Sequence, residues 1–343
     1  MREVSAGFGH RVLQVHPTLR CNLKCTHCYS SSSPANVEEM DVEPLRDAIT
    51  AAAHLGFQSM SVSGGEPLMY RGLDELLAHA RSIGMRTGVV TNGALVSKDK
   101  VKQLAALVDV VAVSLDGPKD LHNRIRGSHQ SYDRALRALA LLAEAGVSTA
   151  VLHTVTKDSL PFVADLVSTA REHGAAVVRL HPLELYGRAA GSMGGQALDE
   201  GDKNRLYLQA LALDKLLGGG MRVETDLILR AQILGAPERV YASPFHSDGS
   251  ASGVGLIDTL VLGADGDVIP VAYGMNSSYR ICSLRESGLA DGFQNFVDCR
   301  YEGFLNLCRS LYQRLESESR LVVNWHELLV AASNKEPLLA AAG

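Results

Sequence analysis

Short apolar runs rich in β-branched residues alternate with longer amphipathic segments along the first half of the chain. The short runs are typical of buried parallel strands, and they predict six strands, over residues 12–16, 59–63, 86–91, 110–114, 148–155 and 177–181. The longer segments repeat apolar residues at helical spacing, and they predict helices over residues 43–55, 73–83, 98–107, 132–145 and 162–172. This alternation predicts an α/β fold, a partial, open (β/α)6 barrel.

The pattern changes after Gly187 and predicts a second, smaller unit. A glycine-rich stretch, a helix and three further glycines follow there, over residues 187–195, about 198–217 and 218–220. Next come a segment rich in Ser and Gly, two apolar runs that predict a hairpin around a Gly-containing turn, and a mostly helical end, over residues 243–255, 256–262 with 268–270, and 291–343. We therefore expect a core barrel over residues 1–190 and an α+β extension over residues 191–343.

Composition and charge narrow the class of protein. Hydrophobic residues make up 46% and charged residues 21% of the 343 residues, which is ordinary for a globular chain. The formal net charge of −5 provides no general electrostatic reason to bind nucleic acid or anionic lipid. No apolar run reaches the roughly eighteen residues of a membrane span, and the first twenty residues contain no apolar signal segment. The sequence therefore predicts a cytoplasmic protein with neither nucleic acid nor membrane as a partner.

Three of the six cysteines lie within eight residues and point to metal chemistry. Cys21, Cys25 and Cys28 form a C-x3-C-x2-C motif directly after the first predicted strand. Three thiolates on a short loop can ligate three irons of a [4Fe-4S] cluster and leave the fourth iron open to a substrate. The alternatives are a structural zinc site, which needs a fourth ligand such as His27, or three unligated thiols.

With this motif the chain resembles the radical S-adenosylmethionine (SAM) superfamily, whose hallmark is C-x3-C-x2-C in the loop after the first barrel strand. The resemblance extends to Gly64-Gly65-Glu66-Pro67 after the second strand, a motif that in the family lines the site for the SAM amino group. Further matches follow in family order, and these are Thr91-Asn92-Gly93, Ser114-Leu115-Asp116-Gly117 and Arg124-Ile125-Arg126-Gly127. Together the matches cover roughly residues 12–188.

The resemblance also implies individual site residues. Ser114 and Arg126 are implied for the SAM carboxylate or ribose, and Asn92 and Asp116 for shaping the pocket. Arg179 and the following Gly187-Arg188-Ala189 segment are similar to positions near the adenosine and substrate in family members with C-terminal extensions. Asn-Gly and Asp-Gly pairs are also ordinary turn sequences, so a purely structural role stays open for Asn92 and Asp116.

Three histidines at or in predicted strands, His16, His153 and His181, could face the same cavity. A structural role remains the alternative for each of them. For the chemistry, the resemblance implies one [4Fe-4S] cluster that binds SAM, a flavodoxin- or ferredoxin-type electron donor, and a 5'-deoxyadenosyl radical that abstracts a substrate hydrogen atom. The barrel is expected to position the acceptor carbon and to exclude water and oxygen.

The predicted hairpin over residues 257–270 resembles the start of a SPASM or twitch extension, which carries auxiliary iron-sulfur clusters in peptide-modifying relatives. The usual pattern has a cysteine after the hairpin proline, whereas this chain has Pro270-Val271. The second half contains only Cys282, Cys299 and Cys308, too few thiolates for two auxiliary clusters. A single three-cysteine cluster stays open, but buried thiols are the alternative, and we expect an extension without auxiliary clusters.

The implied substrate is a ribosomally made peptide, with a small metabolite such as a sugar, nucleoside or amino acid as the alternative. A hypothesis from another class is a non-catalytic iron-sulfur binding protein. Without an auxiliary cluster to accept an electron, epimerisation, rearrangement or decarboxylation is favoured over oxidative cross-linking. Epimerisation needs a hydrogen donor, for which a thiol is suited, so Cys282, Cys299 and Cys308 are candidate donors.

Overall fold

The computed structural model describes residues 11–237 and 257–338. Two parts of the sequence prediction lie outside the described residues: the Ser- and Gly-rich segment at 243–255, and the first residue of the strand expected at 256–262. Residues 1–10 lie outside them as well. No helix in the described ranges is long and apolar enough to cross a membrane.

Seven parallel strands follow one another in chain order and form the central part of one curved sheet. They are β1 (Val12–Val15), β2 (Ser59–Val62), β3 (Arg86–Thr91), β4 (Val110–Ser114), β5 (Thr149–Val155), β6 (Val177–Pro182) and β7 (Arg222–Thr225). The α/β fold and the six predicted strands are confirmed. The seventh strand was missed because its Arg-Val-Glu-Thr sequence contains a single buried residue, Val223.

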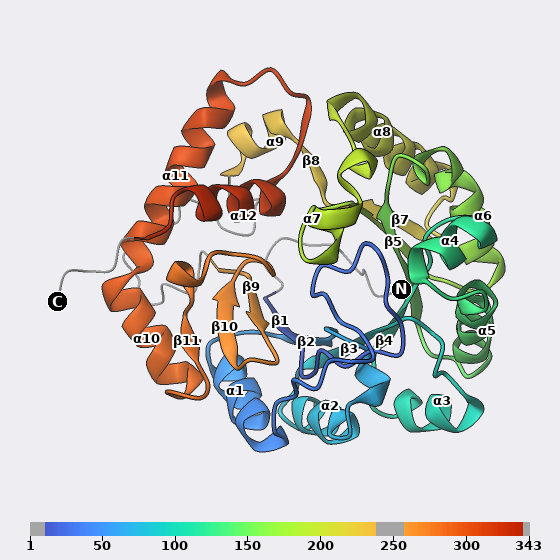
Figure 1. Cartoon of the computed structure of the whole chain (residues 1–343), viewed down its shortest axis with the longest axis horizontal. Helices are drawn as coiled ribbons and strands as arrows, with labels where there is room; N and C mark the ends of the chain where they lie inside the picture. The colour runs from blue at the N-terminus through green and yellow to red at the C-terminus, as the bar shows by residue number, and fades with distance from the viewer. Residues whose placement is uncertain (1–10, 238–256, 339–343) are drawn as a thin grey trace.

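Helices cover the outer face of this sheet (Figure 1). They are α1 (Val42–His54), α2 (Leu73–Ser82), α3 (Lys98–Ala105), α4 (Lys119–Arg126), α5 (Ser131–Glu144) and α6 (Val163–Glu172). Alternate strand residues such as Leu13, Val62 and Leu180 are fully buried and join the hydrophobic core with these helices. The five predicted helices are confirmed. The short helix α4 was missed because most of its residues are charged or polar.

The part of the chain expected to be an extension adds strands to both edges of the same sheet. β7 pairs with β6, while β9 (Thr259–Leu262) pairs with β1 in parallel, followed by antiparallel β10 (Asp267–Pro270) and β11 (Cys282–Ser283). The hairpin is therefore confirmed. The resulting ten-stranded sheet has the order β11-β10-β9-β1-β2-β3-β4-β5-β6-β7. Strands from both sides of residue 190 are thus hydrogen-bonded in one sheet. The division of the chain into two domains at that residue stays a prediction.

The remaining elements complete the rim of the molecule. They are α7 (Arg188–Ser192), α8 (Glu200–Leu216), β8 (Leu227–Leu229), α9 (Arg230–Gly235), α10 (Leu289–Cys299), α11 (Tyr301–Ser317), β12 (Val322–Asn324) and α12 (Trp325–Lys335), with 3-10 turns η1 (Pro67–Met69), η2 (Leu160–Phe162), η3 (Gly194–Gln196) and η6 (Ser277–Tyr279). β8 and β12 form a separate antiparallel pair. The mostly helical C-terminal part is confirmed.

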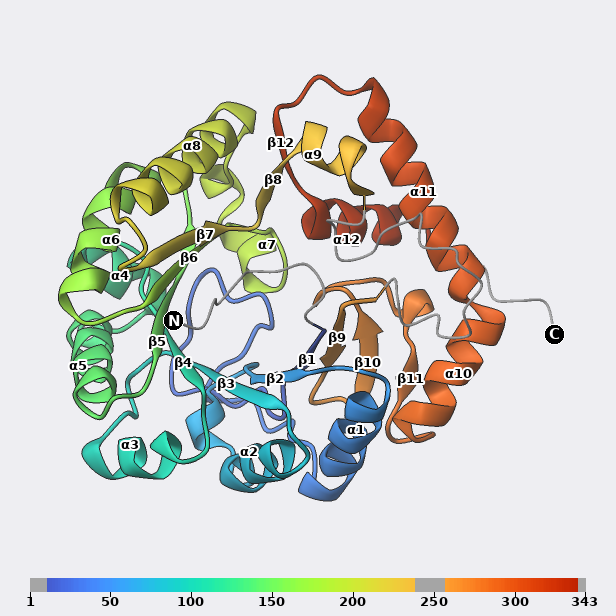
Figure 2. The ribbon, with the colours of Figure 1, turned by 180° about the vertical axis from the view of Figure 1, so that it is seen from behind.

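The long loop between β1 and α1 lies in the middle of this ring of elements, and the view from behind shows the same arrangement (Figures 1 and 2). It begins at the C-terminal end of β1 and contains the three clustered cysteines. Because parallel strands all end at one edge of a sheet, residues that follow β1 to β7 gather around this loop. Ligand sites of open α/β sheets form at that edge.

Candidate functional site

The clustered cysteines lie on one loop, and all three are free thiols. Cys21 and Cys25 are each 8% exposed, and Cys28 is partly exposed. Donors from within the loop reach two of the sulfurs. The Leu23 N–H donates to Cys21 Sγ at 3.4 Å, and the Ser30 hydroxyl lies 3.4 Å from Cys28 Sγ. Hydrogen bonds to sulfur are the contacts that stabilise an iron-bound thiolate.

The donor set fits a [4Fe-4S] cluster better than a zinc ion. His27, the fourth ligand that a zinc site needs, instead places Nε2 3.0 Å from Asp116 Oδ2. Over the described parts of the chain, no three His, Cys, Asp or Glu side chains are grouped closely enough to hold a single metal ion. Burial raises the pKa of Cys21 to about 12 and also raises the pKa of Cys25. These thiols therefore need a bound cation to become thiolates at neutral pH.

The Gly64-Gly65-Glu66-Pro67 turn runs against the start of the cysteine loop. The Gly65 N–H donates to Thr18 O at 2.8 Å, and the Glu66 N–H donates to Arg20 O at 2.9 Å. A Cβ atom on Gly65 would lie 2.2 Å from Arg20 O. Glycine is therefore required here because the two backbones approach too closely for any side chain.

We expect Gly65→Ala to displace the cysteine loop and to lower the iron bound after anaerobic reconstitution to below half of the wild-type amount. The added methyl group meets backbone atoms of Arg20 that cannot rotate away, unlike the end of a side chain. Gly288→Ala, at a glycine with a φ of −67° where a Cβ would meet nothing within 4 Å, is the control for glycine replacement. Iron analysis together with circular dichroism checks the result, and wild-type iron content in Gly65→Ala would contradict it.

Glu66 connects this turn to the end of β3 and is 1% exposed. Its carboxylate accepts hydrogen bonds from the Thr91 hydroxyl at 2.7 Å, the Asn92 N–H at 2.9 Å and the Leu68 N–H at 3.2 Å. Burial raises the pKa of Glu66. Asn92 in turn donates from Nδ2 to Asn22 Oδ1 at 2.8 Å, within the cysteine loop. In the structure both residues therefore shape the loop, and Pro67 begins η1 beside them.

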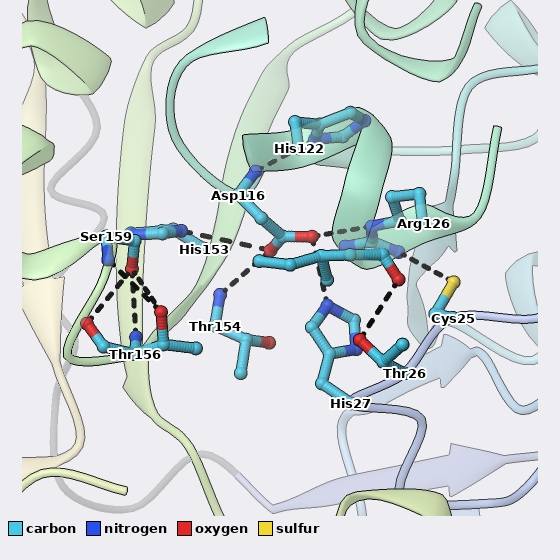
Figure 3. Close-up of polar contacts among 11 residues, drawn as sticks. Cys25, Thr26, His27, Asp116, His122, Arg126, His153, Thr154, Thr156 and Ser159 are labelled. Atoms are coloured by element: carbon cyan, nitrogen blue, oxygen red, sulfur yellow. Dashed lines mark hydrogen bonds and ion pairs between the residues drawn. The ribbon is translucent and has the colours of Figure 1, made fainter. Parts of the chain in front are cut away.

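A buried ionic network lies on the other side of the cysteine loop, at the end of β4 (Figure 3). Asp116 is fully buried, and its Oδ2 accepts a hydrogen bond from Arg126 Nε at 2.6 Å. His27 contacts the same oxygen, and the Thr154 N–H donates to Oδ1 at 3.3 Å. Arg126 Nη1 lies 3.9 Å from Cys25 Sγ. The network thus places a permanent positive charge beside one of the clustered thiols.

Electrostatics keeps this network ionised despite its burial. Burial by itself would raise the pKa of Asp116, but the charges of Arg126 and His27 outweigh it and hold that pKa well below its usual range. For Arg126, burial opposes the charged form, and the neighbouring Asp116 more than compensates and raises the pKa. Ser114 is buried one residue after Val113 at the end of β4, next to this network in sequence. The structure thus brings Asp116 and Arg126 to the cysteine loop, and Ser114 lies two residues before Asp116 at the end of β4.

The three histidines proposed from the sequence have three different surroundings. His16 packs its ring against Tyr29 and Tyr273, with centroid distances of 5.9 and 5.7 Å. Burial lowers the pKa of His16 to about 4, so it is neutral at physiological pH. His153 is fully buried, with Nδ1 3.8 Å from Asp116 Oδ1 in the ionic network. His181 belongs to a separate polar wall.

The polar wall occupies the face of β6 and β7 that points away from the helices. The register pairs Arg179 with Glu224, and His181 follows on the same face, where its Nδ1 contacts the Asp226 carboxylate. Arg179 lies 3.8 Å from Glu224 and 3.9 Å from Asp226. The intervening residue Leu180 is fully buried against the helices. This alternation exposes charged side chains toward the inside of the sheet's curve.

The C-terminal elements bring further charges to the polar wall. Asn324 donates from Nδ2 to Glu184 Oε1 at 3.2 Å, and Lys203 Nζ lies 2.7 Å from Glu327 Oε2. Burial, together with the charges of Asp226 and Glu327, raises the pKa of Glu184 to about 7. Sequence reasoning found Arg179 and His181 but missed the acidic partners. These come from distant segments that the fold alone brings together, and no local pattern marks them.

We expect Glu184→Gln to stabilise the protein at pH 8 but not at pH 5. The unfolded Glu184 loses its proton near pH 4.5 and the folded one near pH 7, so wild-type stability falls as the pH rises between these values. Glutamine lacks this ionisation and keeps an acceptor for Asn324, so the variant should gain about 3 kcal/mol over the wild type across that range. Denaturant unfolding at both pH values checks this, and parallel pH curves would contradict it.

The cysteines of the second half lie in the hairpin and helical layer. Cys282, 6% exposed, packs against Gly292 of α10, and Cys308, 1% exposed, lies in the hydrophobic core, whereas Cys299 is exposed at the end of α10. Burial raises the pKa of Cys282 to about 11 and also raises that of Cys308. These surroundings favour packed thiols for Cys282 and Cys308. The role of the three as hydrogen donors stays a prediction.

The chain is similar in sequence to known proteins. The family model described as the radical SAM superfamily matches residues 15–166. The chain is 37% identical over 155 residues to the Fe-coproporphyrin III synthase of Methanosarcina barkeri. The matched region covers 44% of this chain and 39% of that protein. It is 29% identical over 283 residues to the mycofactocin maturase MftC of Mycolicibacterium smegmatis, which covers 81% of this chain and 67% of MftC.

Among solved structures, the fold is similar to that of SuiB of Streptococcus suis bound to its precursor peptide SuiA. The TM-score is 0.64 at 20% sequence identity, with 88% of this chain and 73% of SuiB covered. SuiB has also been crystallised with SAM. At this identity the likeness concerns the fold alone. The chain spans about half or less of the first curated relatives that it matches, between 39% and 49% of their lengths.

Proposed function

We propose that this chain, whose residues 15–166 match the radical SAM family model, is a radical SAM enzyme that uses one [4Fe-4S] cluster and SAM to take a hydrogen atom from its substrate. The observation that carries the proposal is the set of three buried or half-buried thiols on one loop, with Arg126 Nη1 3.9 Å from Cys25 Sγ. A structural iron-sulfur protein has no need of the glycine turn and ionic network around such a loop.

The chain's own residues have distinct parts in this proposal. Cys21, Cys25 and Cys28 bind three irons, while Glu66 and Asn92 fix the loop that carries them. When bound, the cluster and SAM supply the reductive cleavage that produces a 5'-deoxyadenosyl radical, which no side chain can provide. Ser114, Arg126 and Arg179 are proposed to bind the polar groups of SAM; they lie at the end of β4, at the end of α4 and within β6.

We propose a ribosomally made peptide as the substrate. The support is similarity to MftC, which is named a maturase, and the shared fold with SuiB, which was crystallised with a precursor peptide. A small metabolite is the second candidate, because the relative with 37% identity is an Fe-coproporphyrin III synthase. The polar wall of Arg179, His181, Glu224 and Asp226 is proposed to contact either substrate. A flavodoxin- or ferredoxin-type protein in the cytoplasm is proposed as the electron donor.

The test of the proposed function is SAM cleavage by anaerobically reconstituted protein with dithionite as the reductant. We expect 5'-deoxyadenosine and methionine in equal amounts, detected by mass spectrometry. A protein that binds the cluster without cleaving SAM would support the non-catalytic alternative. A short peptide encoded beside this protein, added to the same assay, distinguishes the substrate classes. With a single cluster we propose a redox-neutral product, so a cross-link formed with net two-electron oxidation would contradict that part.

We expect about four irons and four sulfides per chain after anaerobic reconstitution, because three thiolates hold one cubane and the second half has too few cysteines for a full auxiliary set. Replacing Cys282, Cys299 and Cys308 together with serine should leave this number unchanged. Iron and sulfide analysis decides the question. About eight irons in the wild type, falling to about four in the triple variant, would show that the extension binds a second cluster.

A further inference from the structure

The segment after β6 folds back onto the cysteine loop and contacts it along its length. Its polar groups meet the loop almost entirely through carbonyl oxygens. Arg188 Nε donates to Cys25 O at 2.7 Å, and the Arg188 N–H donates to Cys28 O at 3.0 Å. The same guanidinium donates to Ser31 O at 3.4 Å and also to Ser32 O. One side chain therefore connects Cys25 with Ser31 and Ser32, on either side of Cys28 in the sequence.

The neighbouring residues extend this contact. The Ser192 hydroxyl donates to Thr26 O at 3.2 Å, from the last position of α7. Gly187 has a φ of 54°, and a Cβ atom there would lie 2.1 Å from Tyr29 O and 2.7 Å from Cys28 O. The segment thus combines a glycine that permits close approach with an arginine that satisfies the carbonyl groups it meets.

The direction of these carbonyl groups matters for an anionic cluster. A carbonyl oxygen carries partial negative charge, so carbonyls that face bound thiolates repel electrons added to the cluster. Here the carbonyls of Cys25, Thr26 and Cys28 are directed toward the Arg188 segment. The sulfurs of the loop receive other donors, such as the Leu23 N–H at Cys21 Sγ. Backbone dipoles and hydrogen bonds of this kind set both the reduction potential and the stability of iron-sulfur clusters.

We propose that Arg188, with Gly187, is a positioning residue that holds the cysteine loop in its metal-binding shape and directs the loop's carbonyl oxygens away from the cluster. This inference rests on the proposed function for the identity of the cluster. The contacts of Arg188 and Gly187 with the cysteine loop, here called the clamp, are a property of the protein without iron. Removing the guanidinium leaves several loop carbonyls without their donor and removes a positive charge that contacts the backbone of Cys25. The loop should then open more often, and the reduced cluster should become less stable.

The first measurement needs no metal. Full-length apo-protein is treated with iodoacetamide, and the alkylation rates of Cys21 and Cys25 are measured by mass spectrometry relative to exposed Cys299. We expect Arg188→Met to raise the rates of Cys21 and Cys25 about tenfold, the effect of one lost charge-assisted hydrogen bond. The alkylation rates in Arg188→Lys should lie between those of the wild type and Arg188→Met, and the rates in Gly187→Ala should resemble those in Arg188→Met. Arg124→Met is the matched control, because this exposed arginine of the adjacent helix pairs with Asp158 instead.

The second measurement uses reconstituted protein. We expect Arg188→Met to lose iron to a chelator about tenfold faster than the wild type, by the same lost contacts. Its midpoint potential, from an electron paramagnetic resonance titration, should move to more negative values, a shift that a merely structural role would not produce. Wild-type alkylation and potential in both Arg188→Met and Gly187→Ala, or equal effects of Arg124→Met, would overturn the proposal. If Arg188→Met does not fold, Arg188→Lys and Gly187→Ala decide it.

The two proposals can fail separately. A wild-type protein that binds no iron would refute the proposed function, while the alkylation rates would still decide the clamp. A wild-type protein with about four irons, whose loop and potential do not respond to Arg188, would refute the clamp alone.

Discussion

Replacing Cys21, Cys25 and Cys28 with alanine is expected to abolish both the broad charge-transfer absorption of the reconstituted protein and its cleavage of SAM. In the proposed site each thiolate supplies one iron ligand, and the remaining cysteines lie outside this loop, on β11, α10 and α11. Absorption spectra and 5'-deoxyadenosine measurements check this. Each single variant is expected to lose SAM cleavage as well, because two thiolates leave the cubane open at two irons.

The matched control for the cysteine variants is Cys299→Ala, which removes an exposed thiol outside the loop. It is expected to keep the wild-type absorption and cleavage of SAM, neither of which needs a hydrogen donor. The apo-protein of the triple variant should also unfold at nearly the wild-type denaturant concentration, since the loop cysteines contact few apolar groups outside their own small cluster. A triple variant that still cleaves SAM at the wild-type rate would refute the assignment of the cluster to this loop.

Much of the barrel could be predicted because its local patterns agree with its tertiary structure. The run Val110–Ser114 is almost wholly buried, and a parallel strand covered by helices needs such a continuous apolar sequence. β7 violates this rule, because Arg222 pairs with Asp214 of α8 and Glu224 belongs to the polar wall, so that only Val223 is buried. Its pairing with β6 is stabilised by neighbours that lie about 45 residues earlier in the chain, which a local pattern does not contain.

The site shows the same division between local motif and distant partner. The cysteine spacing and the Gly-Gly-Glu-Pro turn are local, and the structure brings them together. The role of Glu66 could not be predicted in detail. Its carboxylate accepts hydrogen bonds from Leu68, Thr91 and Asn92, and the last two are the final residue of β3 and the residue after it. The acidic partners of His181 likewise come from segments beyond any sequence motif. Pairings of this kind depend on the register of the sheet.

The position after Pro270 is a case in which sequence and structure disagree locally. Val271 has a φ of 70° and is 2% exposed. This backbone region suits glycine and disfavours β-branched residues, with a cost on the order of 1–3 kcal/mol. The buried side chain offsets part of this cost through its apolar contacts. The turn after β10 is thus kept by packing in spite of its sequence.

The second large effect is expected for Asp116→Asn, which should destabilise the protein by about 3–5 kcal/mol, because it leaves the buried Arg126 without its countercharge. Asp116 is fully buried, and its Oδ2 lies 2.6 Å from Arg126 Nε. Asp133→Asn is the matched control, since Asp133 pairs with Lys119 on the surface, where such pairs contribute less than about 1 kcal/mol. Denaturant unfolding of the apo-proteins measures both changes.

The direction of the pH dependence gives a further check on the same pair. The pKa of Asp116 is held well below its usual range, so its stabilising effect is present above that range and is lost only as the pH falls through the lowered folded value. The difference in unfolding free energy between wild type and Asp116→Asn should therefore be constant from neutral pH to about pH 5 and shrink in stronger acid.

Adding Arg126→Met to Asp116→Asn should recover part of the lost stability, because the double variant no longer buries an unpaired charge. A double variant less stable than either single one would show that the network is held by packing rather than by charge.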